Sequence, residues 1–458
     1  MAKSKSVWVC QNCGAESPKW IGRCPVCGEW NTYVEERISK PAAGQQRGVV
    51  SSSPPRPLTE VSSLDHRRLV TGTGEFNRVL GGGIVPGTLI LLGGEPGIGK
   101  STLALQVCLQ LSPAVTLYVS GEESAEQIKL RADRLQMPQE NVLIYAETRL
   151  EEIIGQIRHL SPQLVIIDSI QTITTGEIES AAGTVSQIRE SAGKLLALAK
   201  ETGIPILLIG HITKEGTLAG PKVLEHIVDV VLHFEGDPRF FFRILRVLKN
   251  RFGSASELAL FEMKEEGLQE ILNPSELLLS HLDDTLSGIA TAATIDGARP
   301  FLIEIQALVS TAVYGTPQRS TTGFDIRRLH MLLAVLEKRA GFRLSARDVF
   351  LNIAGGLRVD DPAIDLAVTT AILSSYLDIA LPPSVAFAAE IGLSGEVRPV
   401  TRMEQRISEA ARLGFKKIMI SGYNAKKIAA KRHKIEIITV KKMEDAVKYL
   451  FNPKTRQP

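Results

Sequence analysis

The stretch GEPGIGKS, residues 94–101, constrains the fold more than any other part of this sequence. It matches G-x4-G-K-[ST] and stands between the apolar run TLILLGG and the helical pattern STLALQVCLQL. Its glycines allow backbone N–H groups to surround phosphate oxygens at the start of a helix. We expect ATP here, with Lys100 reaching the β and γ phosphates and the Ser101 hydroxyl a ligand of Mg²⁺. The predicted nucleotide-binding residues are Gly94, Glu95, Pro96, Gly97, Ile98, Gly99, Lys100, Ser101 and Thr102.

Apolar runs alternate with helical patterns over residues 58–272, which predicts an α/β domain. The runs TLILLGG, AVTLYVS, NVLIYAE, LVIIDSI and IPILLIG are too apolar for half-exposed strands, so we expect a parallel sheet covered on both faces. DVVLHFEG, FRILRVLKN and ELALFEMKEEGLQEI then follow one another without room for helices. They predict an antiparallel extension at the edge of that sheet.

Polar residues stand at the ends of these predicted strands. Asp168 follows LVII and is the carboxylate expected to hold Mg²⁺ together with Ser101. Glu122 and Glu123 follow LYVSG, and either could polarise the attacking water; we favour Glu122. His211 follows LLIG, from where it could sense the γ-phosphate, although a lone histidine is more often an ordinary core or surface residue.

Four of the five cysteines lie near the N-terminus, at Cys10, Cys13, Cys24 and Cys27. Their C-x2-C, ten residues, C-x2-C spacing is typical of a tetrahedral Zn²⁺ site, with a redox dithiol as the alternative. All three tryptophans also lie within this region, as expected for a small core that a metal holds together. Since every ligand position is filled by a cysteine, we expect a structural zinc finger over residues 1–35.

The 458 residues suggest two or three domains, and a net charge of +3 does not by itself indicate a nucleic-acid partner. A stretch rich in Ser, Pro, Gly and Gln predicts a flexible linker over residues 36–57. Residues 273–458 open with a predicted hairpin, GIATAATIDGARPFLIEIQALV, and continue with helices and short strands as an α+β domain. No apolar run is long enough to predict a membrane span, so we expect a cytoplasmic protein.

The stretch LKNRFGS, residues 248–254, places two cations around an asparagine. If the stretch is a strand, alternation puts Lys249 and Arg251 on the same face, aimed at one target. A solvated basic edge or a contact to DNA phosphates would also fit.

Together, the P-loop, the carboxylates, the four-cysteine finger and KNRFG resemble the bacterial RadA (Sms) family, whose core is a RecA-like ATPase. The resemblance implies an ATP-driven DNA motor of recombination and repair that acts on branched intermediates, assembled as a hexameric ring. It further implies that Lys249 and Arg251 act in trans, stabilising charge on the neighbour's γ-phosphate. The loops after Asp168 and His211 would hold single-stranded DNA, with Lys214 and Lys222 as candidate phosphate contacts and ordinary mobile loops as the alternative.

The C-terminal region, about residues 349–449, resembles the proteolytic domain of Lon. Its Ser–Lys dyad is replaced, with Ala363 at the nucleophile's place and Glu404 where the lysine aligns, so we expect an inactive scaffold. A basic run around Lys426 and Lys427 is either a duplex-binding surface or a solvated face.

The favoured function is therefore a DNA-dependent ATPase and translocase that promotes branch migration. The alternative is a regulatory or assembly ATPase whose finger recruits a protein, such as a recombinase, without moving DNA. An ATP-dependent protease is disfavoured by Ala363 and Glu404.

Overall fold

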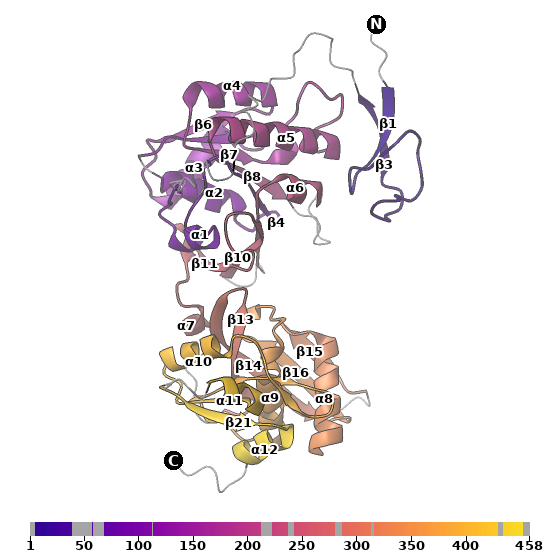
Figure 1. Ribbon diagram of the computed structural model, residues 1–458, viewed down its shortest axis with the longest axis vertical. Coiled ribbons are helices and arrows are strands. Elements are labelled where there is room, and N and C mark those ends of the chain that lie inside the picture. Colours follow the sequence, from indigo (N-terminus) through magenta and orange to yellow (C-terminus); the bar gives the residue numbers. More distant parts are fainter. Residues whose placement is uncertain are drawn as a thin grey trace. The chain divides into compact units, whose positions relative to one another are not determined.

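The computed structural model describes residues 5–38, 57, 68–111, 113–211, 222–236, 242–279, 286–312, 316–428 and 434–451 (Figure 1). The chain forms two compact units, Met1–Ile271 and Leu272–Pro458, and the first of them also contains the N-terminal ribbon. Among the helices of the described part, none combines the length and the apolar character that crossing a membrane requires.

The N-terminal ribbon is a small antiparallel sheet with strand order β2-β1-β3. Its strands are β1 (Lys5–Cys10), β2 (Glu16–Ser17) and β3 (Tyr33–Ile38). Because Ile38 pairs with Lys5, β3 continues past the boundary that the sequence predicted at residue 35. Gly14 and Gly28, each directly after the second cysteine of a C-x2-C pair, have φ of 72° and 78° and donate their N–H groups to the backbone carbonyls of Cys10 and Cys24.

The remainder of the first unit is built on a sheet with strand order β12-β11-β10-β9-β4-β8-β7-β5-β6. The parallel strands are β4 (Leu89–Gly94), β5 (Thr116–Ser120), β6 (Val142–Ala146), β7 (Leu164–Asp168), β8 (Ile206–His211) and β9 (Val230–Glu235). The helices are α1 (Gly74–Val79), α2 (Lys100–Leu109), α3 (Ala125–Leu135), α4 (Leu150–Leu160), α5 (Val185–Thr202) and α6 (Lys222–Ile227), with a 3-10 turn at Ile170–Thr172.

Helices cover both faces of this sheet, as the sequence predicted. The apolar cluster on one face includes side chains of α1, α2 and α3, and the cluster on the other includes side chains of α4, α5 and α6. One strand departs from the prediction of full burial: β6 is only half-buried, because it is the edge strand of the sheet.

The predicted antiparallel extension is confirmed for β10 (Phe242–Asn250), β11 (Leu258–Lys264) and β12 (Gly267–Glu270), which follow β9 as an antiparallel series. By contrast, β9, which the sequence also assigned to the extension, pairs with β4 in parallel and with β10 antiparallel. A bulge between Val247 and Lys249 shifts the register of β10 against β9. The extension is tied to α2 by Gln106, whose side chain accepts the Leu268 N–H at 2.8 Å and donates to the Leu268 carbonyl at 3.1 Å.

The second unit is an α+β domain whose main sheet has the order β15-β16-β14-β13-β17-β20-β21. Its strands are β13 (Ile289–Asp296), β14 (Arg299–Thr311), β15 (Arg319–Thr322), β16 (Arg347–Ile353), β17 (Val385–Ala388), β20 (Lys417–Ser421) and β21 (Glu436–Val440), with a separate small pair β18 (Glu390–Ile391) and β19 (Val397–Arg398). Its helices are α7 (Pro274–Leu278), α8 (Ile326–Ala340), α9 (Asp365–Leu377), α10 (Met403–Arg412), α11 (Gly422–Ile428) and α12 (Met443–Phe451), with 3-10 turns at Ala354–Gly356 and Pro362–Ile364. The predicted hairpin is β13 and β14, closed where Asp296 pairs with Arg299 around Gly297, whose φ is 63°.

Candidate functional site

The phosphate-binding loop connects the end of β4 at Gly94 to the start of α2 at Lys100. Gly97 and Gly99 have φ of 75° and 112°, in the left-handed region that favours glycine. The loop therefore has the strand, turn and helix order that the motif requires, and the N-terminus of α2 faces the place where phosphate binds in such loops.

Lys100 is almost fully buried at the base of this loop. Its Nζ donates to the carbonyls of Gly94 and Glu95 at 2.9 and 2.8 Å. Burial lowers the pKa of Lys100 to about 8, although Asp168, Glu122 and Glu95 oppose the shift. Lys100 is thus a partly desolvated cation held at the base of the loop by backbone carbonyls, and an incoming phosphate oxygen can take the place of those carbonyls.

Asp168 ends β7, between the ends of β5 and β8, and it is buried. Tyr118, from β5, donates its hydroxyl to Asp168 Oδ2 at 2.5 Å. Burial raises the pKa of Asp168, while hydrogen bonds from Tyr118 and Ser101 lower it. The serine hydroxyl and the carboxylate are oxygen donors of the kind Mg²⁺ prefers, so Ser101 and Asp168 fit that ion. Tyr118 was not predicted from the sequence as a residue of this site, because it lies within the apolar run that forms β5.

The two glutamates after β5 have different surroundings. Glu122 Oε1 accepts a hydrogen bond from Ser169 Oγ at 2.5 Å and lies 3.2 Å from His211 Nε2. Glu123 instead forms an ion pair with Arg131 of α3. The structure therefore brings Glu122 and His211 together beside Asp168, whereas the side chain of Glu123, in the loop before α3, is turned to Arg131 of that helix.

The KNRFG segment lies at the other end of the sheet. In β9, Phe234 pairs with Gly94 and Val230 with Ile90, and Asn250 pairs with Val230. The segment is therefore level with the beginning of β4, whereas the phosphate-binding loop follows the end of β4.

Both cations of KNRFG contact the end of α6 in their own chain. Lys249 Nζ donates to the carbonyls of Glu225 and Val228 at 2.6 and 2.7 Å. Arg251 lies beyond the end of β10, and its NH1 is 3.4 Å from Asp229 Oδ1. Strand alternation does not explain their common direction, because β10 is bulged before Lys249 and ends at Asn250.

The four lysines predicted to contact DNA are not placed by this structure. Lys214 lies outside the described residues, and Lys222, Lys426 and Lys427 belong to α6 and α11, where their side chains are not described.

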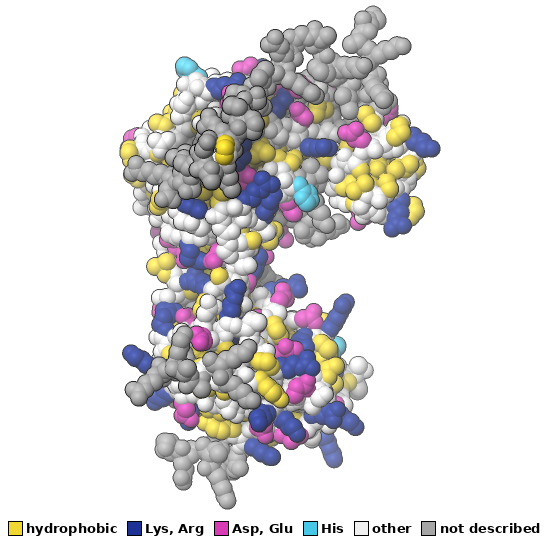
Figure 2. Space-filling model, in the orientation of Figure 1, with side chains coloured by type: hydrophobic (Ala, Val, Ile, Leu, Met, Phe, Trp, Pro, Cys, Tyr) yellow, Lys and Arg dark blue, Asp and Glu magenta, His cyan; other side chains and the backbone are white. Residues whose placement is uncertain are grey.

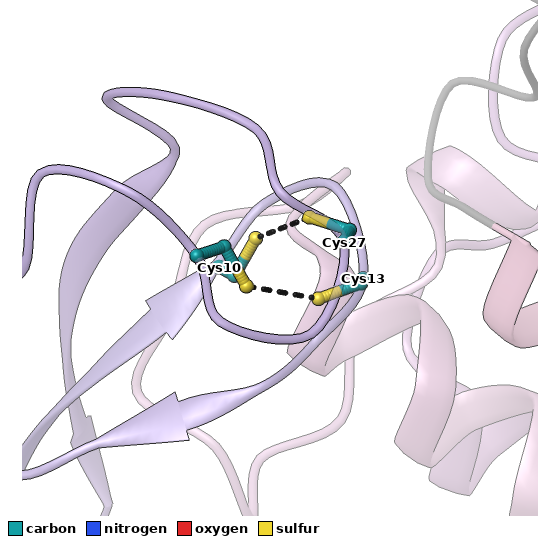
Figure 3. Close-up of side chains that lie close together, drawn as sticks. Cys10, Cys13 and Cys27 are labelled. Carbon is teal, nitrogen blue, oxygen red and sulfur yellow. Dashed lines mark hydrogen bonds between the residues drawn. The ribbon is translucent and has the colours of Figure 1, made fainter.

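The four predicted metal ligands come together in the ribbon. The sulfur atoms of Cys10, Cys13, Cys24 and Cys27 all lie within 4.8 Å of one another, and Figure 3 shows those of Cys10, Cys13 and Cys27 turned toward one another. Cys10 and Cys27 are 3.8 Å apart and Cys13 and Cys24 are 3.5 Å apart, as free thiols. A tetrahedral ion with Zn–S bonds of about 2.3 Å separates its sulfurs by about 3.8 Å, so this arrangement fits zinc.

In the second unit, Ala363 is fully buried in the 3-10 turn Pro362–Ile364, and Glu404 is exposed in the first turn of α10. Beside Ala363, the carboxylate of Asp361 accepts a hydrogen bond from Arg406 NH1 at 2.6 Å. Arg406 is 2% exposed and was not singled out from the sequence.

These features define a P-loop ATPase of RecA-like fold, with an N-terminal zinc ribbon and a Lon-protease-like C-terminal domain. Family comparisons agree: residues 54–217 match an AAA domain, residues 8–35 a rubredoxin metal binding domain, and residues 305–424 subunit ChlI of Mg-chelatase. The chain also matches proteins named DNA repair protein RadA at 51% and 47% identity over 93% and 98% of its length, so it belongs to the RadA family of DNA repair proteins.

Its relatives match over nearly their whole length. It is 51% identical to DNA repair protein RadA of Bacillus subtilis, over 93% of this chain and 94% of that protein. It is 47% identical to the protein of the same name from Halalkalibacterium halodurans, over 98% of this chain and 99% of that protein. Among solved structures, a KaiC-like protein from Pyrococcus horikoshii matches 45% of this chain and 99% of its own, with 21% identity and a TM-score of 0.38.

Proposed function

We propose that this chain is a DNA-dependent ATPase and translocase of recombination and DNA repair, which binds single-stranded DNA and promotes branch migration. The observation that carries the proposal is the position of KNRFG at the end of the sheet opposite the phosphate-binding loop, described above. The name of its relatives, DNA repair protein RadA, supports the repair role. A DNA repair protein acts on chromosomal DNA, and this agrees with the expected cytoplasmic location.

Distance along the sheet supports action between subunits. Asn250 is level with Ile90, and the loop begins at Gly94. At about 3.3 Å per residue, roughly 13 Å of strand separates the two levels. Lys249 and Arg251 are therefore turned away from their own nucleotide site, and a neighbour in a ring would bring its γ-phosphate to them. We propose on this basis that the chain acts as an assembly of several subunits, and the resemblance to RecA-like ring ATPases is what favours a homohexamer.

Within one subunit, the roles follow the geometry around Lys100. Lys100 binds the β and γ phosphates, and Ser101 and Asp168 hold Mg²⁺, which supplies charge neutralisation on the phosphates when bound. Glu122 orients and polarises the attacking water, and His211, 3.2 Å from the Glu122 carboxylate, senses the γ-phosphate.

DNA contacts remain those predicted from the sequence: Lys214 and Lys222 toward single strands, and Lys426 and Lys427 toward duplex. Neutralising a phosphate contact should reduce the salt dependence of DNA binding. Lys426→Gln together with Lys427→Gln would test the duplex surface, since unchanged salt-dependent duplex binding would assign that run to a solvated face.

We further propose that the C-terminal domain is not a protease. The buried Ala363 offers no nucleophilic oxygen, and Glu404 is exposed and has no amine to activate one. ATP-dependent peptide cleavage by the purified chain would contradict this.

A second candidate function is a regulatory ATPase that recruits a protein, such as a recombinase, through the ribbon. Hydrophobic side chains gather on the ribbon's surface in Figure 2, and Trp20, Val26 and Trp30 are 50%, 72% and 66% exposed. Exposed apolar groups of this kind mark protein contacts more often than DNA backbone contacts.

Two measurements separate these functions. The first measurement is the rate of ATP turnover without DNA, with single-stranded DNA and with forked DNA. The second is branch migration of a labelled three-strand intermediate under the same conditions. A motor is stimulated by DNA and moves the junction in proportion to the ATP consumed. Turnover that ignores DNA and leaves the junction in place would favour the recruiting ATPase.

A further inference from the structure

The phosphate-binding loop rests on the antiparallel extension. A Cβ added to Gly94 would lie 2.3 Å from the Phe234 carbonyl of β9, and one added to Gly99 would lie 2.7 Å from Met263 Cε of β11. Ile98 belongs to the apolar cluster that contains Phe234 and residues of β11 and β12. The back of the loop is therefore held by strands that follow it by more than a hundred residues in the sequence.

One polar contact crosses this packed surface. Arg243 of β10 is 8% exposed, and its Nε donates to the Ile98 carbonyl at 3.2 Å, while NH1 donates to the Phe242 carbonyl at 2.9 Å. A Cβ on Gly236 would lie 2.9 Å from Arg243 Cδ, so a glycine at that position leaves room for the arginine stem. The Arg243 guanidinium is thus buried behind the phosphate-binding loop and held there by backbone carbonyls.

We propose that Arg243 is a positioning residue for nucleotide binding. The loop binds phosphate through N–H groups that face the ligand, and its carbonyls must then turn away and find donors elsewhere. Arg243 supplies a charged donor to the Ile98 carbonyl from the side opposite the ligand. It also places a buried positive charge behind a site that binds a polyanion. This inference rests on the ATPase function proposed above.

Arg243 and Lys100 hold different parts of the loop. Lys100 donates to the carbonyls of Gly94 and Glu95, which it exchanges for phosphate oxygens when nucleotide binds. Arg243 contacts Ile98 from the other side of the loop, so we expect this contact to be retained when nucleotide binds. Its loss should therefore weaken nucleotide binding without removing a group that acts on the reacting phosphate.

The experiment uses the full chain with Arg243→Gln and Arg243→Lys. Arg246→Gln is the matched control, because Arg246 lies on the same strand but pairs with Glu235 at 2.9 Å, away from the loop. The measurements are the Kd of a fluorescent ATP analogue, KM and kcat for ATP, and the thermal midpoint with and without nucleotide.

We expect Arg243→Gln to raise Kd and KM about tenfold or more, with kcat at saturating ATP within about threefold of the wild type. Arg243→Lys should recover part of the affinity, since an ammonium keeps the charge but not the planar donor geometry. Arg246→Gln should bind ATP as the wild type does.

Wild-type affinity in Arg243→Gln would overturn the proposal. So would a loss of affinity that is equal in Arg243→Gln and Arg243→Lys and follows the nucleotide-free thermal midpoint, because that result describes a general packing defect. If the wild type itself bound no ATP, the ATPase function would fail instead, so the two failures are distinguishable.

Discussion

Arg251 reaches the buried carboxylate of Asp229, with NH1 3.4 Å from Oδ1, and the other oxygen of the same carboxylate accepts from Lys200 Nζ at 2.7 Å. Asp229 Oδ2 also accepts the N–H of Leu89, the first residue of β4. The Arg251 side chain remains 57% exposed in this arrangement. One carboxylate therefore joins the KNRFG segment to the strand that carries the phosphate-binding loop, while leaving the guanidinium accessible to a neighbouring subunit.

If Arg251 acts in trans as proposed, Arg251→Ala should keep ATP binding and lose most DNA-dependent turnover, since it would remove a positive charge from the neighbour's nucleotide. A mixture tests this directly. Arg251→Ala subunits retain an intact phosphate-binding loop, and Lys100→Ala subunits retain an intact Arg251. Mixing the two inactive variants should restore part of the turnover, because some interfaces then combine both intact halves. Full turnover by Arg251→Ala alone, or none in the mixture, would contradict action in trans.

Glu122→Gln should lower turnover at least about a hundredfold while ATP still binds, since the amide cannot polarise the attacking water. Glu123→Gln is the matched control: its side chain pairs with Arg131, so its loss should change turnover only a few-fold. Single-turnover hydrolysis measured on both variants decides between them. A larger loss in Glu123→Gln would reverse the assignment.

The sequence placed Lys100, Asp168 and His211 at or just after the ends of strands, because each follows an apolar run, and the structure has them there. It favoured Glu122 over Glu123 but offered no contact to separate them, since both follow β5. In the structure their surroundings differ, because Glu122 contacts Ser169 and His211 whereas Glu123 pairs with Arg131. The sequence also could not identify Arg243, one of several cations on β10, whose contact with Ile98 arises where strands distant in sequence pack together.

Two further features depend on tertiary structure alone. The half-burial of β6 comes from its edge position, which an apolar run does not reveal. After a bulge between Val247 and Lys249, β10 ends at Asn250, so the strand alternation that the sequence suggested for KNRFG does not extend to Arg251. A strand pattern predicts side-chain direction only while the strand remains regular.

Removing zinc should unfold the ribbon and leave the ATPase core folded. Because all three tryptophans lie in or beside the ribbon's cysteine pairs, tryptophan emission reports on this part of the chain alone. We expect about one zinc ion per chain by metal analysis, and a red shift of emission on chelation. Cys24→Ser should lose the ion and Cys108→Ala should keep it, since Cys108 lies buried in α2. Absence of zinc from the wild type would refute the site.

Arg406→Ala should destabilise the C-terminal unit by about 3–5 kcal/mol, because the Asp361 carboxylate loses its cation in a nearly buried site and keeps only hydrogen bonds from neutral donors. Gln405→Ala, on the exposed side of the same helix, is the control and should change little. Chemical denaturation gives both free energies of unfolding. The double variant Arg406→Ala and Asp361→Ala should be less destabilised than the sum of the two single variants. Strict additivity would mean that the pair does not interact.

ATP binding should become proton-coupled at alkaline pH, because burial lowers the pKa of Lys100 to about 8. Bound phosphates favour the charged amine and return its pKa toward the ordinary value. At about pH 9, roughly nine tenths of the free lysine is neutral, so binding should take up about one proton, and affinity should fall about fivefold from about pH 8.

The lowered pKa of Lys100 also determines how the stability of the folded chain changes with pH. The unfolded lysine keeps its proton to a higher pH than the folded one, so burial of Lys100 costs stability below about pH 8, and this cost diminishes as the pH rises toward the ordinary lysine pKa. Calorimetric titration in buffers of different ionisation enthalpy measures the proton uptake on ATP binding. Lys100→Arg, whose guanidinium stays charged, should show no uptake at about pH 9. Equal uptake by that variant and the wild type would assign the proton to another group.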